Sequence, residues 1–89
     1  DTNYTDILME ECVTVGKERM KAYDNPMKSM KICSNILKTT FNIDLTVEQI
    51  AYVLVALKAS RQFKSFREDS VIDMINYMAI ALDARRKGI

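Results

Sequence analysis

Two sets of polar residues at helical spacing are the best candidates for chemistry in this sequence. Lys58 and Arg61 are three residues apart at the end of an apolar stretch, so one helix face would present both cations. Asp69, Asp73 and Asn76 follow at i, i+4 and i+7 and form a polar line on an otherwise apolar segment. Cations that bind phosphate and carboxylates that bind Mg²⁺ would together suit a nucleotide.

The same residues also have a purely structural interpretation. Only a short segment separates the two sets, so we expect antiparallel neighbouring helices that bring Lys58 and Arg61 close to Asp69 and Asp73. Opposite charges would then neutralise one another across a helix hairpin, which is the usual condition for burying a charge. Ion-pair networks are more common than ligand sites, and the spacing by itself leaves both interpretations open.

A tight corner, Tyr23-Asp24-Asn25-Pro26, is the third feature. Pro26 cannot continue a preceding helix, but it suits the first position of a new helix that Asn25 or Asp24 would cap. We include Tyr23 and Asn25 among the candidate ligand-binding residues, and we assign no residue a catalytic role.

Four helices are expected to position these residues in one all-α domain that spans residues 1–89. The patterns predict helices over about residues 4–22 and 26–41, a third from Val47 to the basic stretch 60–67, and a fourth from Glu68 to about Lys87. Short loops between them give a four-helix bundle. Because the third helix is apolar almost all round, we expect it at the centre. The fourth is also apolar on more than one face, which predicts burial in a homo-oligomer.

Composition narrows the possible functions further. The 89 residues carry a net charge of +1, with two glycines, one proline and no histidine. Without histidine, Ser-His and Cys-His nucleophiles and the common zinc finger are excluded. The balanced charge gives no strong nucleic-acid signal, no apolar run is long enough for a membrane, and no secretory segment is evident, so we expect a cytoplasmic protein. Cys12 and Cys33 are expected to be buried, reduced thiols.

Three stretches resemble a family of short, uncharacterised helical proteins of bacteriophages and prophages. Those proteins carry a Tyr-Gly-Asp/Asn-Pro corner, a Leu-Lys-x-x-Arg segment and an Asp-Ser-x-x-Asp-x-x-x-Tyr helix. Here the corresponding segments are Tyr-Asp-Asn-Pro, Ala-Leu-Lys-Ala-Ser-Arg and Asp-Ser-Val-Ile-Asp-Met-Ile-Asn-Tyr-Met-Ala, spread over about residues 23–82. The family looks distantly similar to nucleotide-modification-associated domains and to MazG-like all-α nucleotide pyrophosphohydrolases. The resemblance implies a phage protein that handles nucleotides in the cytoplasm of a bacterial host.

This sequence departs from those patterns in two respects. Asp24 stands where the phage family usually has glycine, Ser29 where asparagine is frequent, and Asn76 where glycine is frequent. The MazG-like enzymes hold Mg²⁺ with Glu-x-x-Glu and Glu-x-x-Asp pairs. In this chain Asp69 and Asp73 are four residues apart, and the acids of the first helix lack that spacing: Glu10, Glu11 and Glu18. A related fold that binds without turnover fits these residues better.

Three functions remain as hypotheses. The first is a phage accessory protein, an oligomeric module that binds a nucleotide or nucleotide-like signal and counteracts host defence. Lys58 and Arg61 would hold phosphate, while Asp69, Asp73 and Asn76 would orient the cations or read the base. The second is a Mg²⁺-dependent pyrophosphohydrolase with Asp69 and Asp73 as metal ligands. The third is a small viral inhibitor that docks on a host protein through its helical surface.

Overall fold

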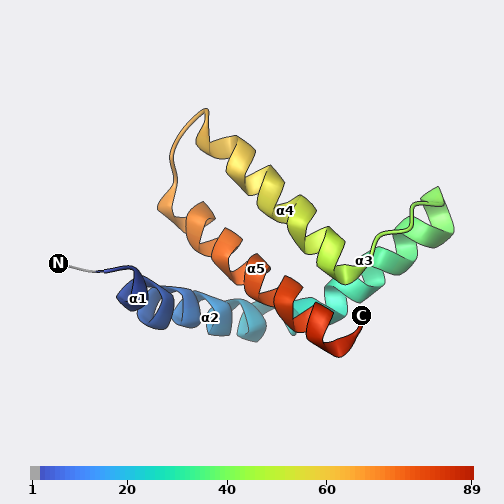
Figure 1. Cartoon of the computed structure of the whole chain (residues 1–89), viewed down its shortest axis with the longest axis horizontal. Coiled ribbons are helices and arrows are strands. Elements are labelled where there is room, and N and C mark those ends of the chain that lie inside the picture. Colours follow the sequence, from blue (N-terminus) through green and yellow to red (C-terminus); the bar gives the residue numbers. More distant parts are fainter. Residues whose placement is uncertain (1–2) are drawn as a thin grey trace.

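A computed structural model of the chain describes residues 3–89, except for the side chain of Tyr23. It confirms an all-α fold of four helical rods, with no strand among the described residues (Figure 1). The first rod runs continuously through α1 (Tyr4–Asp6), a π-helical segment η1 (Ile7–Cys12) and α2 (Val13–Tyr23). The others are α3 (Pro26–Phe41), α4 (Val47–Gln62) and α5 (Glu68–Lys87). None of the described helices combines the length and the apolarity needed to cross a membrane.

Local capping explains where the helices begin and end. Thr46 and Gln49 form the predicted capping box at the start of α4, because each side chain bonds the other residue's backbone N–H. Asn25 caps α3 by accepting a hydrogen bond from the Met27 amide at 3.0 Å. Gly88 ends α5 in the left-handed conformation, with φ of 71°.

Helix α5 lies at the centre of the fold, whereas the sequence predicts the third helix there. It contacts η1, α2, α3 and α4, whereas α4 contacts only α3 and α5 among the helices that the structure describes. In Figure 1, α4 and α5 form an antiparallel hairpin, and the first rod lies along the other side of α5. The outer side of α4 therefore leaves Val53 and Leu57 exposed. The expectation fails because an apolar helix surface does not specify whether a neighbour in the same chain covers it.

The buried core is small and lies where the helices converge. Its members are Met27, Met30, Val47, Ile50, Ala51, Ala81 and Ala84. Cys12 is buried apart from this cluster, and burial raises the pKa of its thiol. Cys33 is exposed on α3, so the prediction of two buried thiols is wrong for this residue. Apolar neighbours in sequence predict burial for Cys33, but the core that covers Met27 and Met30 does not extend over this position.

The start of α4 is tied to the end of α5 by a polar cluster. Glu48 Oε2 accepts hydrogen bonds from the Tyr52 hydroxyl at 2.6 Å and from Arg85 Nε at 2.9 Å. These two hydrogen bonds hold the pKa of Glu48 below its ordinary value. In return, the carboxylate beside Tyr52 raises the pKa of that phenol.

The corner between α2 and α3 contains a strained backbone. Only Asp24 and Asn25 separate the two helices, and Asp24 adopts φ of 66° and ψ of −171°. Glycine reaches this region readily, whereas it costs other residues about 1–3 kcal/mol.

We predict that Asp24→Gly raises the free energy of unfolding by about 1 kcal/mol, because glycine relieves the strain. The ion pair lost with Asp24, to Lys28 at 3.6 Å, is exposed and contributes little. Urea denaturation monitored by circular dichroism would measure the change. Asp24→Ala is the matched control, since it removes the carboxylate but keeps the strain; an equal gain from both variants would contradict the strain argument.

We also predict that Glu48→Gln reduces the loss of stability in acid. A carboxyl whose folded-state pKa is lowered contributes stability above its unfolded pKa, and that contribution disappears as pH falls through the folded-state value. Urea midpoints measured between neutral and acidic pH should therefore fall less steeply for Glu48→Gln than for the parent. Tyr52→Phe, which keeps the Arg85 bond, should give an intermediate slope. Identical pH profiles for all three proteins would show that the Glu48 carboxylate does not cause the loss of stability in acid.

Candidate functional site

The carboxylate of Asp73 is the centre of a charge cluster that joins three helices. Its Oδ2 lies 3.2 Å from Lys58 Nζ of α4, and its Oδ1 lies 3.6 Å from Arg19 Nη2 of α2. The Asp73 side chain is only 12% exposed. The predicted closeness of Lys58 and Asp73 is thus confirmed, and Arg19 is a second cation that the sequence analysis missed.

A pocket of about 600 Å³ lies beside this cluster, between α2, the corner, α4 and α5. Its polar lining includes four of the predicted site residues: Asn25, Lys58, Asp73 and Asn76. Its apolar lining includes Met20, Pro26, Met27, Tyr77 and Ile80. The pocket therefore combines an apolar wall with a few convergent charged groups, which is the usual make-up of a small-molecule site.

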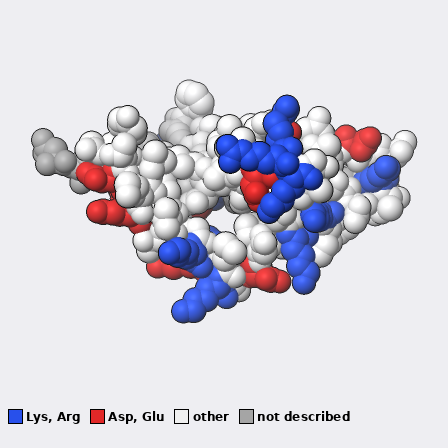
Figure 2. All heavy atoms as spheres, turned by 60° about the horizontal axis from the view of Figure 1, so that its bottom comes forward, with Lys and Arg blue, Asp and Glu red and all other residues white. Residues whose placement is uncertain are grey.

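Each carboxylate that lines the pocket is paired with at least one cation. Asp73 has Arg19 and Lys58, Asp24 has Lys28 at 3.6 Å, and Asp83 has Lys87 at 2.9 Å. Of these four cations only Arg19 and Lys58 line the pocket, so its lining carries one net negative charge, which the two lysines outside the lining offset. Figure 2 shows basic side chains surrounding a small acidic group on the face that forms the bottom of Figure 1.

The beginning of α3 forms part of the pocket wall, but its first amide groups are already occupied. Pro26 has no N–H, the Met27 amide donates to Asn25 Oδ1, and the Lys28 amide donates to the Asn25 carbonyl at 3.0 Å. An anion in the pocket would therefore depend on Arg19 and Lys58 rather than on this helix end.

Asn76 joins the first rod to α5. Its Nδ2 donates to the Cys12 carbonyl at 3.0 Å and to the Ile72 carbonyl at 3.3 Å. Its Oδ1 would lie 2.9 Å from a Cβ added to Gly16, so a larger residue at that point of α2 would force Asn76 to shift. These contacts give Asn76 a structural role in addition to its place in the pocket wall.

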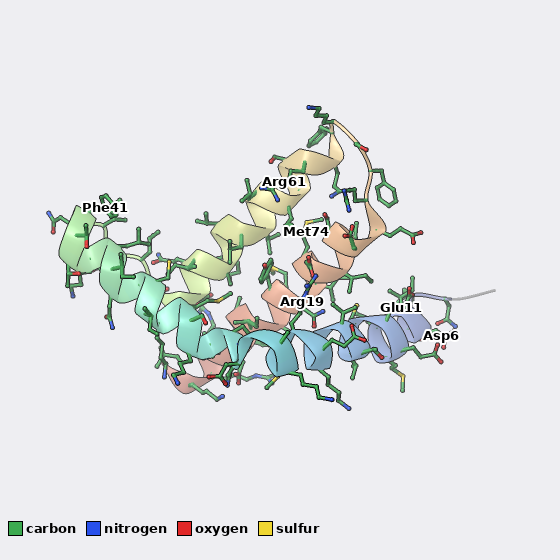
Figure 3. All side chains as sticks on the ribbon, turned by 180° about the vertical axis from the view of Figure 1, so that it is seen from behind. Asp6, Glu11, Arg19, Phe41, Arg61 and Met74 are labelled. Atoms are coloured by element: carbon green, nitrogen blue, oxygen red, sulfur yellow. The ribbon has the colours of Figure 1, made fainter. Side chains whose placement is uncertain are left out.

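Two of the predicted site residues, Arg61 and Asp69, are not among the described residues that line the larger pocket. Arg61 is exposed in the last turn of α4, and Figure 3 shows it well away from Arg19. Within the described part of the chain it forms no ion pair and does not line the pocket, so the expected contact with the aspartates is absent. Asp69 pairs instead with Arg67 at 3.3 Å, and that hydrogen bond lowers the pKa of Asp69. The side chain of Tyr23 lies outside the described residues.

A smaller pocket of about 260 Å³ shares Arg19 and Asp73 with the larger one. Three carboxylates line it: Glu18, Asp69 and Asp73. Among the residues that the structure describes, however, no three acidic or cysteine side chains form a group that could hold a metal ion. Both aspartates are also paired with cations, and an ion with several oxygen ligands would have to displace them. The arrangement of the residues thus fits an anion beside Arg19 and Lys58 better than Mg²⁺.

In the sequence, Gly16 is the feature that could have identified Arg19 as a residue facing α5. A glycine inside a helix weakens it unless a neighbour approaches closely, and here that neighbour is α5 through Asn76. Arg19 lies one turn beyond Gly16 and therefore faces the same neighbour. Figure 3 shows Arg19 on the side of α2 that faces α5.

We predict that Gly16→Ala lowers the free energy of unfolding by about 1 kcal/mol. The loss is expected even though alanine by itself stabilises a helix by about 1 kcal/mol relative to glycine. The added Cβ would push Asn76 away from its bond to the Cys12 carbonyl. In an Asn76→Ala background the clash is gone, and the same substitution should raise stability by up to about 1 kcal/mol. A double-mutant cycle by urea denaturation measures both values, and additive effects would contradict the proposed contact.

Comparisons with known proteins give one result. No curated protein and no solved structure matches this chain. A family model described as a domain of unknown function, DUF6378, matches residues 6–85, which includes all of the pocket-lining residues. The chain therefore belongs to the DUF6378 family.

Proposed function

We propose that this protein binds a phosphate-bearing small molecule, a nucleotide or nucleotide-like signal, in the larger pocket. The observation that carries this proposal is the pair of cations, Arg19 and Lys58, held by one largely buried carboxylate at the wall of a pocket of about 600 Å³. This volume lies in the range of about 300–1,000 Å³ that small-molecule sites occupy.

The two cations have different roles in this proposal. Arg19 is about half exposed and lies 3.6 Å from Asp73, so this contact is weak and its guanidinium is free to turn towards a phosphate. A guanidinium can bind phosphate through two parallel hydrogen bonds. Lys58 is more buried and closer to Asp73, so it stays in place and adds positive charge.

The apolar side of the pocket would receive the base or sugar. Met20, Met27 and Ile80 offer an apolar surface, and Tyr77 offers an aromatic ring with a hydroxyl at its tip. Asn25 and Asn76 border the same space, although both use their side chains in bonds within the protein. Selectivity would therefore depend on the shape of the apolar wall and on the spacing of the two cations.

The resemblance to phage proteins supports a biological setting for this activity. A phage-encoded module that sequesters a nucleotide signal in the host cytoplasm would counteract a defence that uses this signal. Relative to the hypothesis from sequence, Arg19 replaces Arg61 as the phosphate-binding partner of Lys58, and Asp69 lies outside the larger pocket.

A second candidate is a Mg²⁺-dependent pyrophosphohydrolase, and the smaller pocket is the observation that favours it. Glu18, Asp69 and Asp73 line that pocket, which adjoins the charge cluster through Arg19 and Asp73. Metal binding there would require Arg67 to leave Asp69 and Arg19 to leave Asp73. The candidate is weaker, because each aspartate must lose a cation partner before it can bind the metal.

We predict that Arg19→Ala and Lys58→Ala each weaken nucleotide binding about 10- to 100-fold, as expected for the loss of a charged hydrogen bond. The purified protein would be ultrafiltered with a panel of linear and cyclic nucleotides, with and without Mg²⁺, and both fractions analysed by chromatography. Circular dichroism would confirm that each variant is folded. Arg61→Ala is the matched control, because it removes an exposed cation from outside the pocket.

The outcomes separate the candidates. A nucleotide that is retained and recovered intact after denaturation supports the binding module. A nucleotide recovered cleaved only with Mg²⁺, with cleavage abolished in Asp73→Asn, supports the hydrolase instead. If no nucleotide is retained, or if Arg61→Ala weakens binding as much as Arg19→Ala, the proposed site is wrong.

A further inference from the structure

The folded chain exposes more surface than a self-sufficient domain of its size. Its accessible surface is 6779 Å², whereas a folded monomer of 10.2 kDa exposes about 5,300 Å². The radius of gyration is 14.0 Å, against about 12 Å for a compact domain of this length. In the described part of the chain no large side chain is completely buried. The core of a single chain is therefore incomplete.

Part of the uncovered apolar surface lies on the second half of α3. Met27 and Met30 begin the buried stripe of this helix, and Leu37 and Phe41 continue it at helical spacing. Phe41 is nevertheless 63% exposed, because α3 extends past the other helices (Figure 1). We call residues 32–43 the α3 arm. Its large exposed apolar residues are Ile32, Ile36, Phe41 and Ile43.

Helix α4 also has an exposed apolar surface, on the part of the helix that spreads away from the arm. Ile50 is buried, and Val53 and Leu57 follow it at i+3 and i+7, so they lie on the same side of α4. Both are about half exposed. Figure 1 shows α3 and α4 spreading apart from their contact at the start of α4, and Figure 3 shows Phe41 at the far end of the arm.

We propose that a second copy of this chain covers these two surfaces, with the α3 arm of each copy packed against the arm and the outer side of α4 of the other. The excess of about 1,500 Å² per chain would give an interface of about 3,000 Å² in total, within the range of obligate homodimers. Both surfaces belong to the same chain, so a two-fold axis pairs them reciprocally and the interface closes.

The charges of the chain also favour a second copy over a foreign partner. The net charge is +1, so two copies repel each other only weakly. A core that is incomplete in the single chain also needs its partner whenever the chain folds, and a second copy is always present.

We expect light scattering to give a mass of about 20 kDa for the parent protein, twice the 10.2 kDa of one chain. Ile36→Glu should weaken association at least about 30-fold, because it places a charge at the centre of the interface. Met9→Glu is the matched control: Met9 is also an exposed apolar residue, but it lies in η1 at the other end of the molecule.

Two measurements on the parent keep the test decisive if Ile36→Glu does not fold. The urea midpoint should rise with protein concentration, and Cys33, one turn before Ile36, should react with a thiol reagent faster on dilution. A mass of one chain with a concentration-independent midpoint would overturn the proposal, even if a host protein bound the arm. Dissociation by Met9→Glu but not by Ile36→Glu would overturn it too. Both outcomes are independent of nucleotide binding, so this inference and the proposed function can fail separately.

Discussion

The ion pairs of Asp73 are the interaction on which the candidate site depends. A carboxylate that is 12% exposed must be paired, and its two cations come from different helices, Arg19 from α2 and Lys58 from α4. Lys58 thus ties α4 to α5 through this carboxylate, and Arg19 brings α2 to it by a longer and more exposed contact. Because removing one partner of a buried pair leaves an uncompensated charge, the cluster is both a structural joint and the electrostatic centre of the pocket.

Much of the fold was predictable because its signals are local. The capping box of Thr46 and Gln49, the Asn25 cap before Pro26 and the terminal Gly88 each act within one helical turn, and all appear where the sequence placed them. What could not be predicted depends on contacts between helices. Arg61 and Arg19 are equally charged in the sequence, but only the packing of α2 against α5 decides which of them meets Asp73. The same reason explains the exposure of Cys33 and the central place of α5.

The corner between α2 and α3 contains one residue in a strained backbone conformation. With φ of 66° and ψ of −171°, this position favours glycine, and the chain carries aspartate there instead. Strain of this kind persists only where the surroundings hold it, and it is often found at binding sites. Here Asp24 lines the larger pocket, so the strained residue places an additional carboxylate beside the cations.

Helix α3 connects the larger pocket with the arm. Its 16 residues form a rod of about 24 Å, whose first turn borders the larger pocket and whose last turns make up the arm. A rigid rod transmits a tilt at one end as a larger displacement at the other. Any ligand that tilts α3 at Pro26 would therefore change the affinity of the arm for whatever it binds. By thermodynamic reciprocity, occupation of the arm would change the affinity of the pocket by the same factor.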